Sequence, residues 1–235
     1  MEDAPLTFAG LPGCTRHTIV HNMNVSPQDS ALWAATLIHS RRTTLPKRLC
    51  GPGPDDTQKR IILEAAAAAP DHEQILPWRF VEVPHECRAR LGLAFEEALA
   101  TRDPQANADE RLQARDKAMR SPWLLLAVVR SGGQPEDIPA SERVLSAGAA
   151  VQNMLLMATA LGLGSSLTSG KAMASAALRA LFGLAAEEQA LCFLNFGHIR
   201  DTRKERPRPA VDRYFCRLEI TPQGNKDKPT GIVQN

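Results

Sequence analysis

The chain has 235 residues, of which 43% are hydrophobic, so it can bury a sizeable core as one domain or as one domain with appendages. A formal net charge of +2 leaves no broad basic face, which argues against general nucleic-acid binding. The five cysteines are widely spread and show neither a disulfide framework nor a metal-ligand spacing, so we expect no metal. No basic start followed by an apolar run opens the chain, so we expect no secretory signal and a cytoplasmic location.

The predicted organisation is one domain with an extension at each end. Residues 1–25 contain proline, glycine and asparagine without sustained periodicity, so we expect an N-terminal extension with little structure of its own. The domain is expected over residues 26–215 and a C-terminal tail over residues 216–235. The predicted helices and strands all lie inside this domain.

The first helix is predicted over residues 27–39, where Ser26 is the capping residue and proline takes the first helical position. It ends just before Arg41, Arg42 and Thr43. Two interpretations stay open for this pair of cations. They can complement the negative end of the helix dipole, or they can grip an anion, because arginine forks match phosphate oxygens.

A second helix is predicted over residues 57–69, capped by Asp56 or Thr57, and a half-buried strand over residues 78–83. His72 therefore lies in a polar loop between the end of a helix and the start of a strand. Such loops commonly carry functional sites, although a single loop histidine is more often only solvated.

The next segments alternate between charged and apolar residues. Residues 88–120 are strongly charged and predict two helices with a break near Asp103, whose dense charges are most simply a solvated face. Residues 123–129 and 191–196 are continuous apolar runs, which are typical of inner strands covered on both faces.

The longest apolar segment, residues 144–164, predicts a helix that is apolar nearly all round and so belongs in a core or an interface. Polar residues interrupt it, which argues against a membrane span. Gly162 and Gly164 are expected to end the helix, and residues 167–170 to form a polar turn before another helix over residues 172–182. This order of elements predicts a three-layer domain of the α/β or α+β kind.

Several of these motifs, in this order, resemble the nitroreductase superfamily, and most of all its small bacterial NAD(P)H nitroreductase type with a Pro-Asp-His loop. The likeness covers roughly residues 31–208. It implies an α+β fold, a nitroreductase-like three-layer domain with a central, mostly antiparallel sheet flanked by helices, in a homodimer. The motifs are the Arg-Arg-Thr helix end, the Ala-Pro-Asp-His loop leading into Pro-Trp-Arg-Phe, the small-residue central helix, the Leu-Thr-Ser-Gly segment and the strand ending in Phe-Gly-His.

The resemblance also implies one FMN in each of two sites at the subunit interface. Its hydride donor would be NADH or NADPH, and because FMN carries the chemistry, no catalytic residue is implied. The implied FMN contacts are Arg41, Arg42, Thr43, Ala68, His72, Leu167, Thr168, Ser169, Arg206 and Arg208. Solvated tail charges remain an equal alternative for the last two of these. The implied NAD(P)-binding stretch is Met157, Ala158, Thr159, Ala160, Leu161 and Gly162.

The sequence departs from the pattern of such relatives at three places. They usually have arginine where Ala68 stands, glutamine where Leu76 stands, and Trp-Arg where Leu167 and Thr168 stand. Two guanidiniums and a carboxamide are therefore missing from the expected flavin contacts, which would alter flavin affinity, reduction potential or donor fit.

The expected reaction is two-step hydride transfer, from NAD(P)H to FMN and then to a small-molecule acceptor such as a nitroaromatic or quinone. Two other functions stay open: a flavoenzyme of the same fold with another oxidation or dehalogenation reaction, and a non-catalytic flavin-binding dimer. We expect the partner to be a second copy of the chain, since the small residues 146–150 would let the central helix pack closely against its mate. We expect neither nucleic acid nor a membrane as partner.

Overall fold

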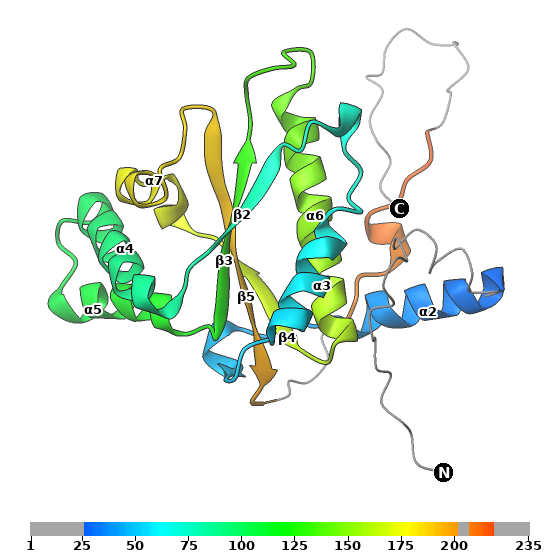
Figure 1. The fold of residues 1–235 in the computed structure, drawn as a ribbon, viewed down its shortest axis with the longest axis horizontal. Helices are drawn as coiled ribbons and strands as arrows, with labels where there is room; N and C mark the ends of the chain where they lie inside the picture. The colour runs from blue at the N-terminus through cyan, green and yellow to red at the C-terminus, as the bar shows by residue number, and fades with distance from the viewer. Residues whose placement is uncertain (1–25, 202–206, 219–235) are drawn as a thin grey trace, which may run out of the picture. The chain divides into compact units, whose positions relative to one another are not determined.

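The computed structural model describes residues 26–201 and 207–218 (Figure 1). The predicted extension over residues 1–25, Arg206 and most of the predicted tail lie outside these described residues. The chain divides into two compact units, Met1–Arg200 and Asp201–Asn235, and each is described by itself. The predicted domain limits at residues 26 and 215 stay a prediction.

The helices and strands of the first unit follow one another in a mixed order. The helices are α2 (Pro27–Ser40), α3 (Asp56–Ala66), α4 (Arg88–Arg102), α5 (Ala108–Asp116), α6 (Ala140–Ala160) and α7 (Ala176–Phe182). The strands are β1 (Leu49–Cys50), β2 (Trp78–Glu82), β3 (Trp123–Arg130), β4 (Gly164–Thr168) and β5 (Glu188–Ile199). Short 3-10 turns are η1 (Pro46–Arg48), η2 (His72–Gln74), η3 (His85–Cys87), η4 (Lys117–Met119) and η5 (Lys171–Ala174), and the second unit holds η6 (Val211–Arg213).

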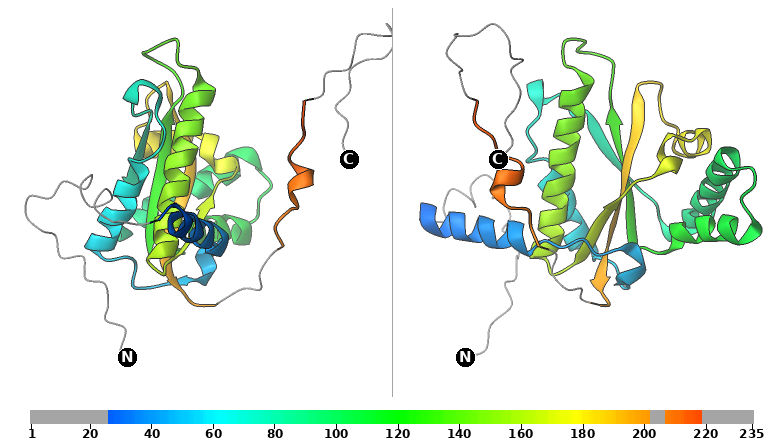
Figure 2. Two further views of the ribbon diagram at one scale, coloured as in Figure 1. Left: turned by 90° about the vertical axis from the view of Figure 1, so that its right-hand side faces the viewer. Right: turned by 180° about the vertical axis from the view of Figure 1, so that it is seen from behind.

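The strands form one five-stranded antiparallel sheet in the order β1-β5-β3-β2, with β4 paired to β5. Helices α3 and α6 cover one face, α4 and α7 cover the other, and α5 packs on α4 (Figures 1 and 2). Successive residues of β3 point to opposite faces, so Leu125 joins the core under α3 and α6 while Leu126 joins the core under α4 and α7. The predicted three-layer α+β fold with a mostly antiparallel sheet is confirmed.

Local signals explain most helix starts. The hydroxyl of Ser26 accepts the N–H of Asp29, as expected for the cap of α2. The predicted cap of α3 at Asp56 or Thr57 is wrong, because Asp55 and Gln58 form a reciprocal capping box one residue earlier. No helix within residues 26–201 or 207–218 is long and apolar enough to cross a bilayer.

The predicted polar turn over residues 167–170 is wrong in its first half. Residues Gly164–Thr168 form strand β4, whose backbone pairs with β5 from Gly197 back to Phe193. Serine, threonine and glycine predict a turn from local preference, but here the ladder of β5 satisfies the backbone hydrogen bonds. The pairing places Thr168 at the end of a strand, where its side chain has a fixed direction.

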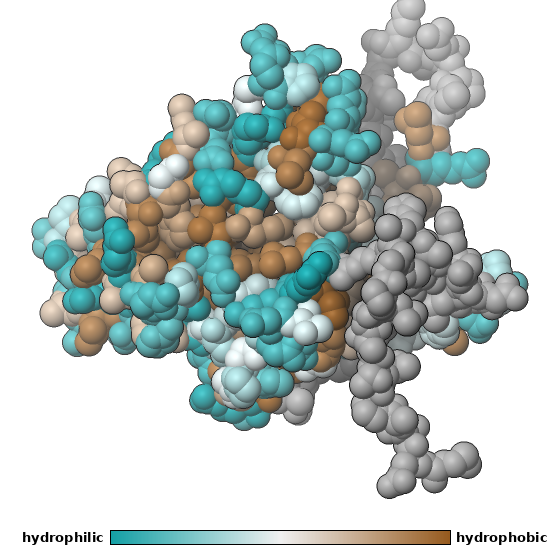
Figure 3. All heavy atoms as spheres, in the orientation of Figure 1, coloured by the Kyte–Doolittle hydropathy of each residue, from teal (hydrophilic) through white to brown (hydrophobic). Residues whose placement is uncertain are grey.

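Helix α2 has no buried residue, although its apolar residues keep helical spacing. Leu32, Trp33 and Ile38 are 64%, 56% and 52% exposed. Figure 2 shows α2 extending past the end of α6, which it contacts. Apolar side chains are exposed elsewhere as well, since a hydrophobic band crosses the face seen in Figure 3. An amphipathic helix without cover on its apolar side indicates an interaction surface.

Candidate functional site

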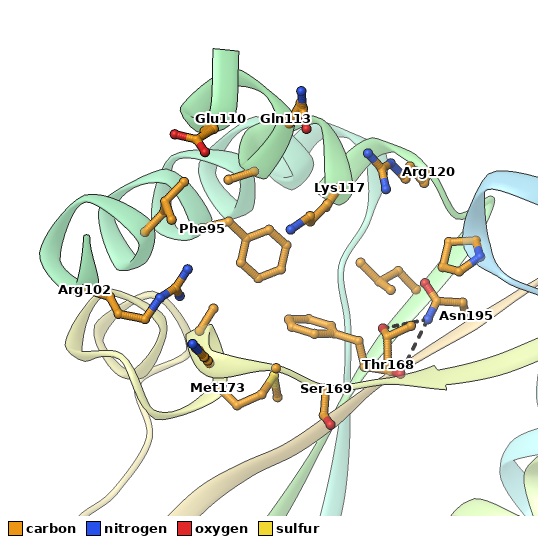
Figure 4. Close-up of a pocket in the computed structure, with 18 of the residues that line it drawn as sticks. Phe95, Arg102, Glu110, Gln113, Lys117, Arg120, Thr168, Ser169, Met173 and Asn195 are labelled. Carbon is orange, nitrogen blue, oxygen red and sulfur yellow. Dashed lines mark hydrogen bonds between the residues drawn. The ribbon is translucent and has the colours of Figure 1, made fainter. Parts of the chain in front are cut away.

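A cavity of about 580 Å³ lies between α4 and α5 on one side and the end of β4 with η5 on the other (Figure 4). This volume is within the range of small-molecule sites, about 300–1,000 Å³. Its apolar part includes Phe95 from α4 and Phe193 from β5, whose rings meet edge to face with centroids 5.5 Å apart. Leu124 of β3 also lines it. Such a surface suits a flat, largely apolar ring.

A buried carboxamide lies at one end of the cavity. Asn195 is 3% exposed, and its Nδ2 donates to the carbonyl oxygen of Ser166 at 3.3 Å and to Oγ1 of Thr168 at 3.1 Å. These bonds turn the carboxamide oxygen away from β4 (Figure 4). Because the hydroxyl of Thr168 already accepts one hydrogen bond, its own proton can be donated to a ligand. The end of β4 therefore offers a directed donor and a nearby acceptor.

Lys117 and Arg120 also line the cavity, Arg120 toward the end that holds Asn195 and Lys117 over the middle, near Phe95 (Figure 4). Lys117 begins η4 and Arg120 follows it, and a buried guanidinium fixes this turn in place. Arg88 is 4% exposed and donates to the backbone oxygens of Ala118 at 2.8 Å and Ser121 at 3.1 Å. Burial lowers the pKa of the Arg88 guanidinium below its ordinary value. The positions of both cavity cations thus depend on a hydrogen-bonded residue in the core.

Three of the predicted site residues, Thr43, Thr168 and Ser169, lie at the cavity or beside strand β4, which leads to it. Thr168 and Ser169 line it directly. Thr43 forms an isolated bridge with Ser165 at the start of β4, and Pro46, three residues later, lines the cavity.

The two predicted arginines lie just before this bridge, at the end of α2. The backbone N–H of Arg41 donates to the oxygen of Leu37. Nη1 of Arg42 donates to the backbone oxygens of His39 and Arg41. The segment from Arg41 to Thr43 is therefore anchored beside the start of β4.

His72 lies elsewhere, beside the N-terminal end of α6, whereas the segment after α2 passes the C-terminal end of α6 (Figures 1 and 2). Its Nδ1 is 2.7 Å from Oε2 of Glu142, in the first turn of α6. Ala68 is on the same connection, between α3 and η2, and is exposed. Within one chain, the predicted flavin contacts therefore lie at two opposite ends of α6, with His72 and Ala68 near its start and Arg41 to Thr43 near its end.

The pair of His72 and Glu142 predicts a pH dependence. Its hydrogen bond raises the pKa of His72 above the ordinary value of 6.5. Since the folded pKa is the higher one, the stabilising effect is fully present below pH 6.5 and is lost as the pH rises through the raised pKa. We expect an NMR titration of the His72 ring to show a midpoint above 6.5 that falls in Glu142→Gln. An unchanged midpoint in this variant would contradict the pairing.

Leu167 points away from the cavity, as alternation along a strand requires. It is 50% exposed and lines a smaller hollow of about 210 Å³ with Gly148 and Gln152 of α6. The predicted Leu-Thr-Ser segment therefore serves two surfaces, one on each side of β4.

The predicted NAD(P)-binding stretch forms the end of α6 and the residues that follow it. Ala158 is 0% exposed in the core, and the hydroxyl of Thr159 donates to the backbone oxygen of Leu155 at 2.9 Å. Gly162 has a positive φ of 72° just beyond the helix end. The assignment of residues 157–162 to NAD(P) stays a prediction. The same holds for Arg208, which is exposed in the second unit.

Three cavity residues, Lys117, Arg120 and Asn195, were not predicted from the sequence. The two cations belong to a charged run whose composition predicts a solvated face, and spacing alone does not separate a solvated cation from one that lines a cavity. Asn195 did carry a signal, since it is the one polar residue within the apolar run 191–196. Within the described ranges, no group of three or more His, Cys, Asp or Glu side chains could hold a metal ion.

The fold and the cavity define an α+β protein with a small-molecule site beside an antiparallel sheet. Residues 38–198 match the model described as "Nitroreductase family", and the chain belongs to this family. It is 32% identical to the Escherichia coli (strain K12) protein YdjA, an NAD(P)H nitroreductase by name, over 70% of this chain and 87% of YdjA.

Two solved structures share the fold. A nitroreductase-like family protein from Bacillus cereus matches with a TM-score of 0.67 at 20% identity, over 79% of this chain and 95% of that one. A Desulfovibrio desulfuricans chain, a nitroreductase by name and in complex with FMN, matches with a TM-score of 0.59 at 23% identity, over 80% of this chain and 97% of that one.

Proposed function

We propose that the protein is an FMN-dependent oxidoreductase that takes hydride from NADH or NADPH and passes it to a nitroaromatic, a quinone or a similar electron-poor acceptor. The observation that carries the proposal is the cavity with an aromatic surface, a directed hydroxyl at Thr168 and the two cations Lys117 and Arg120 in its lining. Family membership, the nitroreductase name of YdjA and the FMN in the Desulfovibrio desulfuricans structure support it.

The side chains present fit FMN. This cofactor needs cations at two separated places, because it carries a phosphate and a ring edge that becomes negative on reduction. Arg41 and Arg42 precede Thr43, which pairs with the start of β4, and Lys117 and Arg120 line the cavity at which β4 ends. The five residues of β4 span about 13 Å at about 3.3 Å per residue. We assign the first pair to the phosphate and the second pair to the ring edge.

Bound FMN would supply the hydride transfer chemistry. The protein's own residues would hold and tune it. The hydroxyl of Thr168 and the cations of Lys117 and Arg120 would stabilise negative charge on the ring, and Phe95 and Phe193 would exclude water from one side of the site.

We further propose a homodimer in which each site is shared. His72 lies at one end of α6 and Arg41 at the other, so one chain alone cannot bring them together. A second copy related by a two-fold axis across α6 would place the His72 end of one chain at the Arg41 end of the other. The uncovered apolar side chains of α2 support such an interface. We place the dimer in the cytoplasm, where the unpaired Cys50, Cys87, Cys192 and Cys216 would remain reduced.

The absorbance spectrum of purified protein tests the proposal, followed by anaerobic titration with NADH and with NADPH. A flavin spectrum that bleaches with either donor and returns with a nitroaromatic or quinone supports it. Bound flavin that neither donor reduces would favour the flavin-binding dimer, which the missing arginines at positions 68 and 168 make a specific alternative. A flavin that either donor bleaches but neither a nitroaromatic nor a quinone reoxidises would favour the alternative function, a flavoenzyme with another oxidation or dehalogenation reaction.

The phosphate assignment predicts the effect of Arg42→Ala. Loss of one charge-assisted contact costs about 1.5–3 kcal/mol, so FMN affinity should fall about tenfold to a hundredfold. Equilibrium dialysis of FMN measures the change, with Arg90→Ala, an exposed residue of α4 outside the cavity, as control. Equal affinity in Arg42→Ala and the control would refute the assignment.

A further inference from the structure

Four cations line the cavity, more than the flavin assignment uses. They come from the end of α4, the two ends of η4 and the start of η5, and are Arg102, Lys117, Arg120 and Lys171. In the part of the chain that the structure describes, none of their four side chains takes part in an ion pair or a hydrogen bond. A concave surface with low-dielectric walls concentrates the field of such charges.

Two carboxylates line the same cavity, but both already bind backbone donors. Oδ1 of Asp103 accepts the N–H of Gln105 at 3.2 Å, just after α4. Oε2 of Glu110 accepts the N–H of Asn107 at 2.9 Å in the capping box of α5. These acids reduce the net positive charge, yet their hydrogen-bonding oxygens are directed at the chain. The cations are therefore the groups best placed to bind a ligand.

Complementing helix dipoles does not explain the whole set. Arg102 ends α4, where a cation is favoured by the negative end of the helix dipole. Lys171 is the first residue of η5, where that argument would favour an anion instead. At least this lysine needs a different explanation, and it lines the cavity beside Ser169 and Met173.

Arg102 lies at the end of the cavity opposite Arg120 and Asn195 (Figure 4). Lys117 and Arg120 belong to the proposed flavin edge, which leaves Arg102 and Lys171 for another ligand. Between the two ends lie apolar side chains, among them Phe95 and Met173.

We infer that Arg102 and Lys171 select an aromatic or quinonoid acceptor that carries a carboxylate or another oxyanion. The inference rests on the proposed function, since the acceptor is the one of that reaction. The acceptor ring would lie against Phe95, with its anionic group toward Arg102, in the cavity that Lys171 also lines. The guanidinium fork of Arg102 can bind both oxygens of a carboxylate, and Lys171 adds a second positive charge. The two residues determine specificity and take no part in the hydride transfer.

The test compares two pairs of shape-matched probes on the FMN-loaded protein. Benzoate and benzamide, which cannot be reduced, are compared by calorimetric binding. The reducible pair, para-nitrobenzoate and para-nitrobenzamide, is compared by kcat/KM. The variants are Arg102→Gln and Lys171→Gln, and the control is Arg90→Gln, whose exposed side chain lies on α4 but not in the cavity.

We expect the wild type to bind benzoate more tightly than benzamide. Each cavity variant should lower benzoate affinity about fivefold to tenfold, with benzamide unchanged, because one charge-assisted contact is lost at a partly solvated site. The preference of kcat/KM for para-nitrobenzoate should fall in parallel, and added salt should weaken it in the wild type. Equal affinity for the two probes, or an equal loss in Arg90→Gln, would overturn the inference.

Arg102 and Lys171 could instead bind the phosphates of NADH or NADPH. Measuring flavin reduction by the dinucleotide apart from flavin oxidation by the acceptor distinguishes these two ligands. If Arg102 and Lys171 serve the acceptor, anaerobic flavin reduction by either dinucleotide stays unchanged in both variants. The assignment to the acceptor would be overturned if the variants reduced the flavin more slowly with NADH or NADPH and still preferred each carboxylate probe over its amide as the wild type does. If the protein holds no FMN or NAD(P)H does not reduce it, the proposed function fails, while benzoate binding still tests the two cations.

Discussion

Replacing Arg143 with alanine is expected to destabilise the protein by about 3–5 kcal/mol, because it removes a buried charged group with many hydrogen bonds. Arg143 is 1% exposed, although it stands in the first turn of α6. Its donors bind four backbone oxygens of the preceding loop: Ile138 at 3.0 Å, Gly132 at 3.2 Å, Gly133 at 2.9 Å and Pro135 at 2.5 Å. Alanine would leave these carbonyls without that donor.

Urea unfolding measures the change in the free energy of unfolding, with Arg90→Ala on the exposed side of α4 as control. The free energy of unfolding of Arg143→Lys should lie between those of Arg143→Ala and the control, since lysine keeps the charge but not the planar fork. A loss below about 1 kcal/mol, within the range of an ordinary surface change, would refute the role of Arg143.

Arg143 also illustrates which features of the fold the sequence predicts. Helix α2, the break between α4 and α5 and the apolar strands β3 and β5 follow from local caps and periodicity, and the structure confirms each of them. Arg143 and Arg88 stand in charged or helical segments, where a guanidinium is expected to be exposed. Arg143 binds the loop just before its helix and Arg88 binds η4 about 30 residues away, and no residue pattern marks either segment as a partner.

Strand β4 also differs from the sequence prediction, because its pairing partner lies elsewhere along the chain. A segment of glycine, serine and threonine has a weak preference for strand, and only the neighbouring β5 makes it one. The consequence for the site is direct, because β4 places Thr168 toward the cavity and Leu167 toward α6. The motifs of the sequence thus identify the segment from Leu167 to Ser169 but not which of its side chains face the cavity.

The predicted site residues were brought together only in part. Motif order predicted a shared environment for Arg41, His72 and Thr168, and the structure places the first and third at β4 and the second at the far end of α6. The order of motifs in a sequence does not distinguish contacts within one chain from contacts between two copies of it. The separation becomes an argument for a dimer only when the uncovered surfaces of α2 and α6 are known.

Replacing Gly148 with leucine is expected to weaken the proposed dimer strongly while leaving the single chain folded. Gly148 is exposed on α6, and a Cβ built on it would meet no atom within 4 Å in its own chain. Within one chain, leucine should stabilise α6 by about 0.5–1 kcal/mol, because glycine is a poor helix former. The hollow beside Gly148 and Leu167 suggests that a side chain of the second copy enters there.

If α6 meets its mate at this position, a leucine overpacks the contact at a cost of about 1–3 kcal/mol, and the two-fold axis repeats the change. The dimer dissociation constant should then rise at least about thirtyfold. Because His72 of one copy and Arg41 of the other would complete each FMN site, the variant should release FMN at concentrations where it dissociates. Gly148→Ala adds a single methyl group and should show a smaller effect in the same direction.

Sedimentation velocity across a range of protein concentrations measures the association, and the flavin absorbance that sediments with the protein measures the shared site. The wild type should remain a dimer at micromolar concentration with an interface on the order of 2,000 Å². A wild-type monomer that still carries flavin would refute the shared site. A Gly148→Leu dimer that is more stable than the wild type would show instead that leucine meets only solvent there, and the two-fold contact would have to lie elsewhere on α2 or α6.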